Sequence, residues 1–210
     1  MLAPRSGRGC GRSRRGGQAI AVQGDLAKTA DIEAMVVEVV ARFGPIDILV
    51  NNAAVFDFKA LPDIDEAHIH HIFNTNVLGL LTTTGVAVAN FNPEGGSVVN
   101  ISSLSALGNA PGGAVYSASK AAVNAITKVL ALELAERKIR VNAIMPGYID
   151  TEGARAIGLK GSEQEAHLIA ATPLERPGRP SDLSPVAIFL ASRASAWMTG
   201  EVLTVSGGQR

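Results

Sequence analysis

The sequence has few of the features that mark secreted, membrane or disulfide-stabilised proteins. Its single cysteine, Cys10, allows no internal disulfide, so we expect a reducing, cytoplasmic compartment. We find no apolar run long enough to span a membrane and no apolar segment typical of a secretory signal. Aromatic residues make up 4% of the chain and charged residues 18%. What is present is an Ala- and Val-rich chain of 210 residues, which suits one globular domain.

The net charge of zero conceals an uneven distribution of charge. Residues 1–18 hold five of the 19 basic residues and no acid, which leaves 14 basic against 19 acidic residues in the remainder, a net charge of −5. An acidic body argues against a nucleic-acid-binding protein. A nucleic-acid binder with a basic tail is therefore the weakest of the alternatives, and it would show DNA binding that depends strongly on salt.

From Ala19 onward, short apolar segments alternate with helical patterns. We predict strands at 19–22, 46–50, 97–101, 140–145 and 201–206. Helices are predicted at 31–43, 65–90, 114–136 and 182–192, the first beginning at Asp31 as N-cap and ending at Gly44. This alternation predicts an α/β fold in which helices cover both faces of a parallel sheet.

Polar and Gly-rich residues follow the predicted strands. They form the stretches "QGD" (23–25), "NNAA" (51–54), "SS" (102–103) and "PGYIDT" (146–151). Parallel sheets of this kind bind ligands at the carboxyl ends of their strands. We therefore expect the functional site to be built from these stretches.

Tyr116 and Lys120 stand four residues apart in "YSASK", so a helix places them on one face. An ammonium near a phenol favours the phenolate and is expected to lower the Tyr116 pKa from about 10 towards neutrality. Such a tyrosine exchanges a proton with a substrate oxygen near pH 7. The alternative is a solvated pair on a surface helix.

Four further polar residues have alternative interpretations. Ser103, at the end of a strand, either hydrogen-bonds a substrate oxygen or only forms a turn. Asn76, within a helix, is either part of a site or locally bonded. His68 and His71 share a helical face, but no Cys or carboxylate pair completes a metal site, so we expect a solvated face and no metal.

Taken together, the motifs resemble the short-chain dehydrogenases/reductases. The stretches that carry the resemblance, in the order and spacing of that family, are "NNAA", "NTNVLG", "VVNISS", "YSASK", "RVNAIMPGYIDT" and "WMTGEVLTVSGG". The resemblance spans about 19–206 and is nearest to 3-oxoacyl-carrier-protein reductases and glucose-dehydrogenase-like enzymes. It implies a Rossmann-like, doubly wound parallel sheet, N-terminally truncated, and an NAD(P)-dependent oxidoreductase of carbonyl or alcohol substrates such as 3-oxoacyl thioesters, sugars or ketones.

The resemblance also implies a catalytic tetrad. Tyr116 would be the general acid/base, and Ser103 would orient the substrate oxygen. Lys120 would lower the Tyr116 pKa and hold the nicotinamide ribose, while Asn76 would fix a water that links Lys120 to a proton relay.

The cofactor implied is NADP or NAD, without a preference between them. The residues expected to contact it, besides Tyr116 and Lys120, are Asp25 and Leu26 beside the adenine, Asn52, Ala53 and Ala54 along the ribose, and Pro146, Gly147, Ile149 and Thr151 at the nicotinamide and pyrophosphate. Ala54 replaces a frequent glycine, and Ser206 stands where aspartate is frequent.

Residues 1–18 depart from the family, whose members begin with a strand, a Gly-rich turn, a helix and a second strand. A βαβ unit needs on the order of 30 residues, and the glycines of this segment complete neither G-x-G-x-x-G nor T-G-x-x-x-G-x-G. We interpret 1–18 as an Arg/Gly-rich tail that is disordered, arising from a wrongly started reading frame, and 19–210 as a single Rossmann-like domain. A transit peptide or a basic interaction tail are the alternatives.

The departure of residues 1–18 from the family's opening strand, turn, helix and strand has structural and functional consequences. Two strands of the family's sheet lie between the equivalents of "AIAV" (19–22) and "IDILV" (46–50), so we expect "AIAV" to slide inward and complete a five-stranded sheet. Without a pyrophosphate loop, we expect weak or absent hydride transfer. The alternative function is a non-catalytic remnant that keeps only its oligomerisation surface.

Two further segments suggest partners. The helix at 114–136 is apolar nearly all round, which suits burial on two sides and a homodimer or homotetramer interface. Residues 152–176 resemble a mobile lid over a small-molecule substrate.

Overall fold

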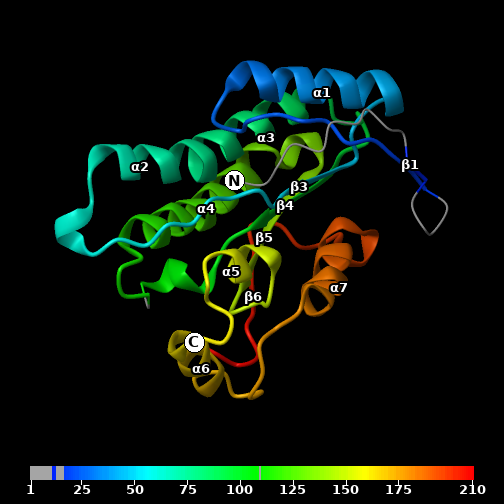
Figure 1. Ribbon diagram of the computed structural model, residues 1–210. Coiled ribbons are helices and arrows are strands. Elements are labelled where there is room, and N and C mark those ends of the chain that lie inside the picture. Colours follow the sequence, from blue (N-terminus) through cyan, green and yellow to red (C-terminus); the bar gives the residue numbers. More distant parts are fainter. Residues whose placement is uncertain (1–10, 13–16, 109) are drawn as a thin grey trace.

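The computed structural model describes residues 11–12, 17–108 and 110–210, and its centre is a parallel sheet (Figure 1). The sheet contains β3 (Ile48–Asn51), β4 (Gly96–Ile101), β5 (Ile139–Pro146) and β6 (Val202–Val205), hydrogen-bonded in the order β3-β4-β5-β6. All three neighbouring pairs are parallel. The four strands predicted after residue 45 are confirmed.

Helices cover both faces of this sheet. α4 (Ala114–Glu133) packs on β4 and β5, α3 (Leu80–Ala89) packs on β3, and α7 (Pro180–Ala191) packs on β4 and β5 from the other side (Figure 1). Val98 belongs to the core under α3 and α4, whereas its neighbour Val99 belongs to the core under α7. Strand residues that alternate between two apolar layers explain why the strands read as continuous apolar runs. The predicted α/β Rossmann-like arrangement is confirmed.

The first long helix, α1 (Thr29–Phe43), begins two residues before the predicted start. Lys28 is its N-cap, so the assignment of Asp31 as N-cap was wrong. Asp31 lies in the first turn instead, where its carboxylate accepts a hydrogen bond of 2.9 Å from the backbone N–H of Asp25. Gly44 ends the helix with φ of 83°, a left-handed conformation that glycine adopts readily.

The helical segment predicted at 65–90 is one continuous run of three parts: α2 (Glu66–Phe73), a π-helical segment η2 (Asn74–Gly79) and α3. This run, Glu66–Ala89, is long and apolar enough to cross a membrane by length and composition, which corrects the expectation that no such run exists. Its three parts contact α1, α4 and β3. The same apolar content is therefore used in packing within the fold.

α4 ends at Glu133, three residues before the predicted end, and a 3₁₀ turn, η4 (Ala135–Arg137), follows it. Its inner face is buried against the sheet, while Val129 and Leu132 on the outer face are 52% and 79% exposed. The predicted subunit interface on this outer face stays a prediction.

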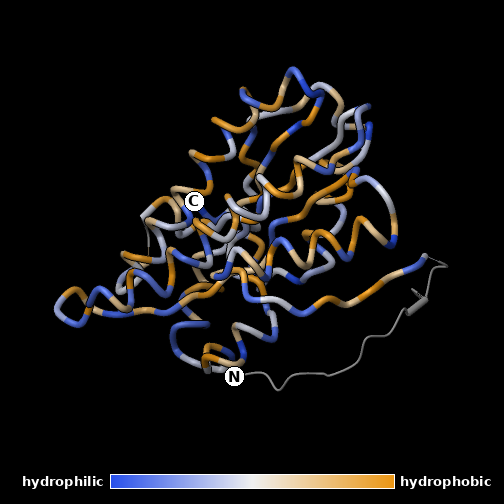
Figure 2. Tube along the Cα trace, turned by 90° about the horizontal axis from the view of Figure 1, so that it is seen from above, coloured by the Kyte–Doolittle hydropathy of each residue, from blue (hydrophilic) through white to orange (hydrophobic). Residues whose placement is uncertain are grey.

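The expectation that "AIAV" joins the sheet was wrong. Only Ala19 of this segment is in a strand, β2 (Gln18–Ala19), which pairs antiparallel with β1 (Gly11–Arg12) apart from the main sheet. The segment that follows runs along the outside of the molecule (Figure 2) and is anchored to helices, with the Leu26 carbonyl against Gly79. Apolar content alone did not supply "AIAV" with a hydrogen-bonding partner in the main sheet.

The rest of the predicted tail, residues 1–10 and 13–16, lies outside the described residues. Gly11 and Arg12 form β1, and the disorder predicted for residues 1–18 stays a prediction. Among the described residues, nothing pairs with the outer edge of β3, so the edge that "AIAV" was expected to fill is open. Ile48 and Val50 of this strand are 48% and 47% exposed.

A matched pair of substitutions tests the open edge. Val50 and Val99 are register partners in adjacent strands, but Val50 is 47% exposed and Val99 is fully buried. We expect Val99→Ala to lower the free energy of unfolding by about 2 kcal/mol or more and Val50→Ala by less than about 1 kcal/mol, because the cost follows the apolar area buried. Urea denaturation of both variants measures this. Equal losses would mean that the β3 edge is covered in solution.

Candidate active site

The polar residues predicted to form the site gather at the carboxyl ends of β4 and β5 and on the adjoining face of α4. Ser103 follows β4 directly, and Tyr116 and Lys120 lie in the first two turns of α4. α4 contacts β4, β5 and the 3₁₀ turn η3 (Leu104–Leu107) that follows Ser103. Three of the four predicted catalytic residues are thus brought together by the docking of one helix on two strands.

Lys120 is a buried cation. Its side chain is on the inner face of α4, only 4% of the residue is exposed, and its Nζ donates to the carbonyl of Ile101 at 2.9 Å. Burial lowers the pKa of Lys120 to about 8, because the low-dielectric interior disfavours the charged form. Nζ lies 5.9 Å from the centroid of the Tyr116 ring.

Tyr116 lies between two phenylalanines that the sequence analysis missed. The ring centroids of Phe56 and Phe58 are 6.3 Å and 5.7 Å from that of Tyr116. Burial raises the Tyr116 pKa above its usual value of 10, and a hydrogen bond with Ser103 lowers it in part. The predicted lowering by Lys120 was therefore wrong for this structure, because desolvation of the phenol outweighs the other effects.

Ser103 has a second local role. Its backbone is extended, and its Oγ accepts from the backbone N–H of Ser105 at 3.2 Å, which caps η3. The cap fixes the hydroxyl at the end of β4 on the side that faces Tyr116.

Asn76 lies in the π-helical segment η2 and is buried. Its amide accepts from the backbone N–H of Val55 and donates to the Val55 carbonyl, both at 2.8 Å, and it donates to Ser119 Oγ at 3.1 Å. Ser119 in turn donates to the Tyr116 carbonyl at 2.7 Å. Asn76 thus joins the chain after β3 to the helix that carries Tyr116.

A second polar network lies beneath the site, and sequence reasoning missed it. Asn51 donates to Asn100 at 2.9 Å and to Thr84 at 3.0 Å, and Asn100 donates to Thr127 at 2.9 Å. Asn100, Thr84 and Thr127 are buried, so each bond satisfies a group that would otherwise be costly. The only hint in the sequence was asparagine at the ends of two apolar strands.

The residues expected to contact the adenine and its ribose lie on the β3 side. Asp25 and Leu26 precede α1, where Asp25 also accepts from the backbone N–H of Ala27 at 3.0 Å. The stretch expected to follow the ribose comes directly after β3, with the first two residues exposed and the third half-buried; its members are Asn52, Ala53 and Ala54.

The residues expected at the nicotinamide follow β5. Pro146 ends the strand, and the N–H of Gly147 donates to the Val205 carbonyl at 3.1 Å. Ile149 forms a bridge with Gly178, and Thr151 caps the short helix α5 (Glu152–Ala156) by accepting from Ala154 N–H at 3.2 Å.

The lid-like segment contains α5 and α6 (Glu163–Ala170), which were not predicted as helices. Tyr148 donates to Glu165 at 2.6 Å and fastens α6 to the end of β5. The Tyr148 pKa is raised by burial and by the hydrogen bond to Glu165. Arg155 and Lys160 both pair with Asp150, at 2.7 and 3.0 Å.

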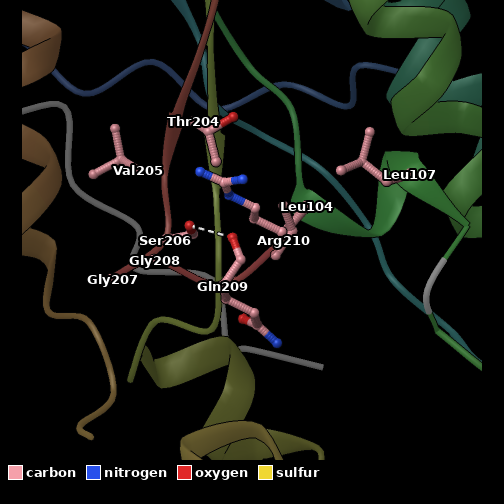
Figure 3. A pocket seen from close by; sticks show the side chains of 9 residues that line it. All are labelled: Leu104, Leu107, Thr204, Val205, Ser206, Gly207, Gly208, Gln209 and Arg210. Carbon is pink, nitrogen blue, oxygen red and sulfur yellow. Dashed lines mark hydrogen bonds between the residues drawn. The ribbon is translucent and has the colours of Figure 1, made fainter. Parts of the chain in front are cut away.

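Two cavities share Val205, Ser206 and Gly207 at the end of β6. The larger, of about 660 Å³, is lined by Leu104 and Leu107 of η3 and by residues 204–210 (Figure 3). The smaller, of about 210 Å³, includes Tyr148, Ile149 and Thr172. Neither Tyr116 nor Ser103 lines either cavity, although Leu104 in the larger one is the residue after Ser103.

The histidine pair does not behave as expected. His68 is buried rather than solvated, with Nδ1 3.3 Å from Asp57 Oδ2, whereas His71 is exposed. The described part of the chain contains no group of three or more His, Cys, Asp or Glu placed to hold a metal.

Comparison with known proteins assigns this arrangement to a family. The family model described as enoyl-(acyl carrier protein) reductase matches residues 10–210. An oxidoreductase of Methylorubrum extorquens AM1 is 49% identical over 195 residues, which cover 93% of this chain and 78% of that protein. The chain belongs to the short-chain dehydrogenase/reductase family. It is an oxidoreductase of this family, whose members use NAD(P)H.

Another relative and two solved structures are also similar to this chain. The 3-oxoacyl-(acyl-carrier-protein) reductase of Thermotoga maritima is 38% identical over 178 residues, covering 84% of this chain and 71% of the reductase. The structure of a blue fluorescent protein from a metagenomic library, in complex with NADPH, matches with a TM-score of 0.82 and 32% identity, covering 89% of this chain and 74% of that one. A candidate short-chain alcohol dehydrogenase from Sinorhizobium meliloti 1021 matches with a TM-score of 0.85 and 34% identity, covering 90% and 75%.

The buried ammonium of Lys120 gives this short-chain dehydrogenase/reductase a characteristic pH dependence of stability. Because the Lys120 pKa falls from 10.5 to about 8 on folding, the unfolded chain binds more protons between these pH values. The free energy of unfolding should therefore rise with pH in this window, by about 3 kcal/mol in total, and the penalty should be fully present below pH 8. Urea denaturation at several pH values measures the slope.

Two lysine variants separate this contribution from other titrations. Lys120→Met should remove the rise, whereas Lys128→Met, exposed on the same helix, should keep the wild-type profile. Identical profiles for the two variants would contradict a buried ammonium at Lys120.

Proposed function

We propose that the chain transfers hydride between NADP or NAD and a small-molecule carbonyl or alcohol substrate. The observation that carries the proposal is the convergence of Ser103, Tyr116 and Lys120 at the end of β4, where η3, capped by Ser103, packs on α4 and Lys120 donates to the Ile101 carbonyl. The substrate classes within the proposal are 3-oxoacyl groups on acyl-carrier protein, which the name of the Thermotoga reductase favours, and ketones or sugars. A soluble, cytoplasmic homo-oligomer belongs to the same proposal.

The residues at the nicotinamide end fit a dinucleotide. An ammonium has three donors, and the bond from Lys120 to Ile101 uses one, so others can reach ribose hydroxyls. Pro146, Gly147 and Ile149 would lie along the nicotinamide, with Thr151 towards the pyrophosphate. When bound, the dinucleotide supplies or accepts the hydride.

The residues near β3 fit the pyrophosphate and adenine end of the dinucleotide less well. Anionic pyrophosphate is held well where a helix begins after a strand, and the described residues place no such helix start beside the open edge of β3. Asp25, Leu26, Asn52, Ala53 and Ala54 would provide the remaining contacts. We therefore propose weak binding and slow turnover.

The chain's own residues would handle the proton. Tyr116 Oη would donate to the developing alkoxide in reduction and accept from the alcohol in oxidation. Ser103 Oγ would hold the substrate oxygen beside Oη. The raised Tyr116 pKa keeps the phenol protonated near neutral pH, which suits reduction. Both amide hydrogens of Asn76 are engaged, so only the free lone pair of its Oδ1 would be left to hold a relay water.

A second candidate function is a non-catalytic remnant that keeps its oligomerisation surface. The observations that favour it are the open β3 edge and the exposed Leu132 and Val129 on the outer face of α4. Fluorescence titration with NADPH and NADH decides between the two. Saturable binding that is weakened by Lys120→Met supports the oxidoreductase, whereas no binding at millimolar nucleotide by a folded chain supports the remnant.

Tyr116→Phe tests the assigned chemistry. It removes only the hydroxyl, so we expect the rate of hydride transfer to a carbonyl substrate to fall by about 10²–10⁴-fold while the NADPH dissociation constant stays within about twofold. Single-turnover absorbance of NADPH measures the rate. Tyr148→Phe, the other tyrosine of the chain, should retain far more activity. An unchanged rate in Tyr116→Phe would refute the assignment.

A further inference from the structure

The two phenylalanines beside Tyr116 belong to a single segment, residues 55–60, which we call the aromatic loop. The Phe56 ring meets the Tyr116 ring edge-on, at an interplanar angle of 72°, and the Phe58 ring is tilted against it at 49°. Each also abuts a helix start: a Cβ on Gly153 would come within 3.1 Å of Phe56, and a Cβ on Gly113 within 3.0 Å of Phe58. The loop therefore fills the space between Tyr116 and the lid helix α5.

The ends of the aromatic loop are fixed by hydrogen bonds. Val55 is held by the two bonds to Asn76. At the other end, the backbone N–H of Lys59 donates to the Gly112 carbonyl at 2.9 Å, and Lys59 Nζ lies 3.7 Å from Asp65. The two phenylalanines lie between these anchors and have no hydrogen bonds of their own to fix them.

The middle of the loop has one polar contact, between Asp57 and His68. Asp57 lies between the two phenylalanines, and its Oδ2 is 3.3 Å from His68 Nδ1 on α2. The His68 side chain is 1% exposed, and this contact is at ion-pair distance without the alignment of a hydrogen bond, so Nδ1 has no hydrogen-bond partner. Among the described residues, Asp57 has the one carboxylate within ion-pair distance of this buried nitrogen, so its departure would leave the nitrogen without a polar neighbour of opposite charge.

The rings of Phe56 and Phe58 give Tyr116 an apolar wall on the side of the aromatic loop. Phe58 is 41% exposed, so part of this wall is open to a ligand. The charged members of the aromatic loop, Asp57 and Lys59, pair with the first turns of α2 rather than face Tyr116. A polyhydroxylated substrate would find no hydrogen-bonding group on these two rings, whereas an apolar chain or ring would replace water against them.

We infer that the Asp57–His68 contact is a tether that positions Phe56 and Phe58 against Tyr116, and that this aromatic wall selects substrates with an apolar chain or ring beside the carbonyl. The substrate class rests on the proposed function, while the positioning of the wall does not. Asp57 and His68 are positioning residues, since they act through the phenylalanines.

A spectroscopic test needs no activity. The chain has two tyrosines, so in a Tyr148→Phe background the phenolate absorbance reports Tyr116 alone. Loss of the tether should expose the ring and shift its titration towards the usual pKa of 10, because burial is what raises it. Asp57→Asn also removes a charge, so His68→Leu, which leaves the Asp57 carboxylate in place, is the decisive variant. His68→Asn keeps an N–H donor at this position, so its Tyr116 titration should match that of the wild type.

The chain offers a matched control. Glu66 and His70 make a similar contact, at 3.2 Å, on the exposed side of the same helix. Glu66→Gln and His70→Leu should leave the Tyr116 titration unchanged. Shifts of equal size in the control and tether variants, or none in His68→Leu when urea denaturation shows it is folded, would overturn the tether.

Kinetics test the substrate class. With NADPH, His68→Leu should raise KM for acetophenone by about tenfold, leave kcat within about twofold, and leave KM for dihydroxyacetone unchanged. Equal changes in KM for the two ketones, or a preference of the wild-type chain for dihydroxyacetone, would contradict the inferred selection of apolar substrates. If no variant turns over NADPH but the Tyr116 titration shifts only in the tether variants, the proposed function fails and the tether stands.

Discussion

The docking of α4 on β4 is the contact on which the site depends, and it is largely polar. Three successive residues of β4 and its extension each bond the helix: Asn100 to Thr127, the Ile101 carbonyl to Lys120, and Ser102 to the Lys120 carbonyl at 3.2 Å. Apolar packing tolerates small sliding of a helix, whereas buried hydrogen bonds lose most of their strength when misaligned. The polar seam therefore sets the register in which α4 places Tyr116 beside Ser103.

This polar seam also explains why a charged residue is kept in the interior. The cost of burying the Lys120 ammonium appears as its lowered pKa. That cost is offset only in part by one carbonyl, which leaves the ammonium with donors for a ligand. A site of this kind is preorganised for a partner with hydroxyl or phosphate oxygens, and binding of such a partner would relieve the unsatisfied charge.

Much of the fold could be predicted from local pattern, since periodicity reports burial and the buried strands and long helices followed from it. Pairing could not be predicted this way. "AIAV" reads as a strand, yet whether it pairs depends on contacts such as that of Leu26 with Gly79, which join distant segments. The functional site, like the fold, was predicted from the sequence only where local spacing decides the structure. The sequence pattern placed Tyr116 and Lys120 on one helical face, but the direction of the Tyr116 pKa depended on the burial of its ring. Phe56 and Phe58, some 60 positions earlier, lie beside that ring, and no spacing rule predicts their approach.

The open edge and the site are not independent of each other. Asn51 ends β3, the strand with the free edge, and bonds both Asn100 and Thr84, so the exposed strand contributes to the buried network under the site. The chain then continues from β3 through the residues held by Asn76 into the aromatic loop. Fraying of β3 would release Asn51 first and would loosen the start of that loop next. A partner that pairs with the β3 edge would therefore stabilise the surroundings of Tyr116 without touching them, because the same strand carries both the free edge and the support of the site.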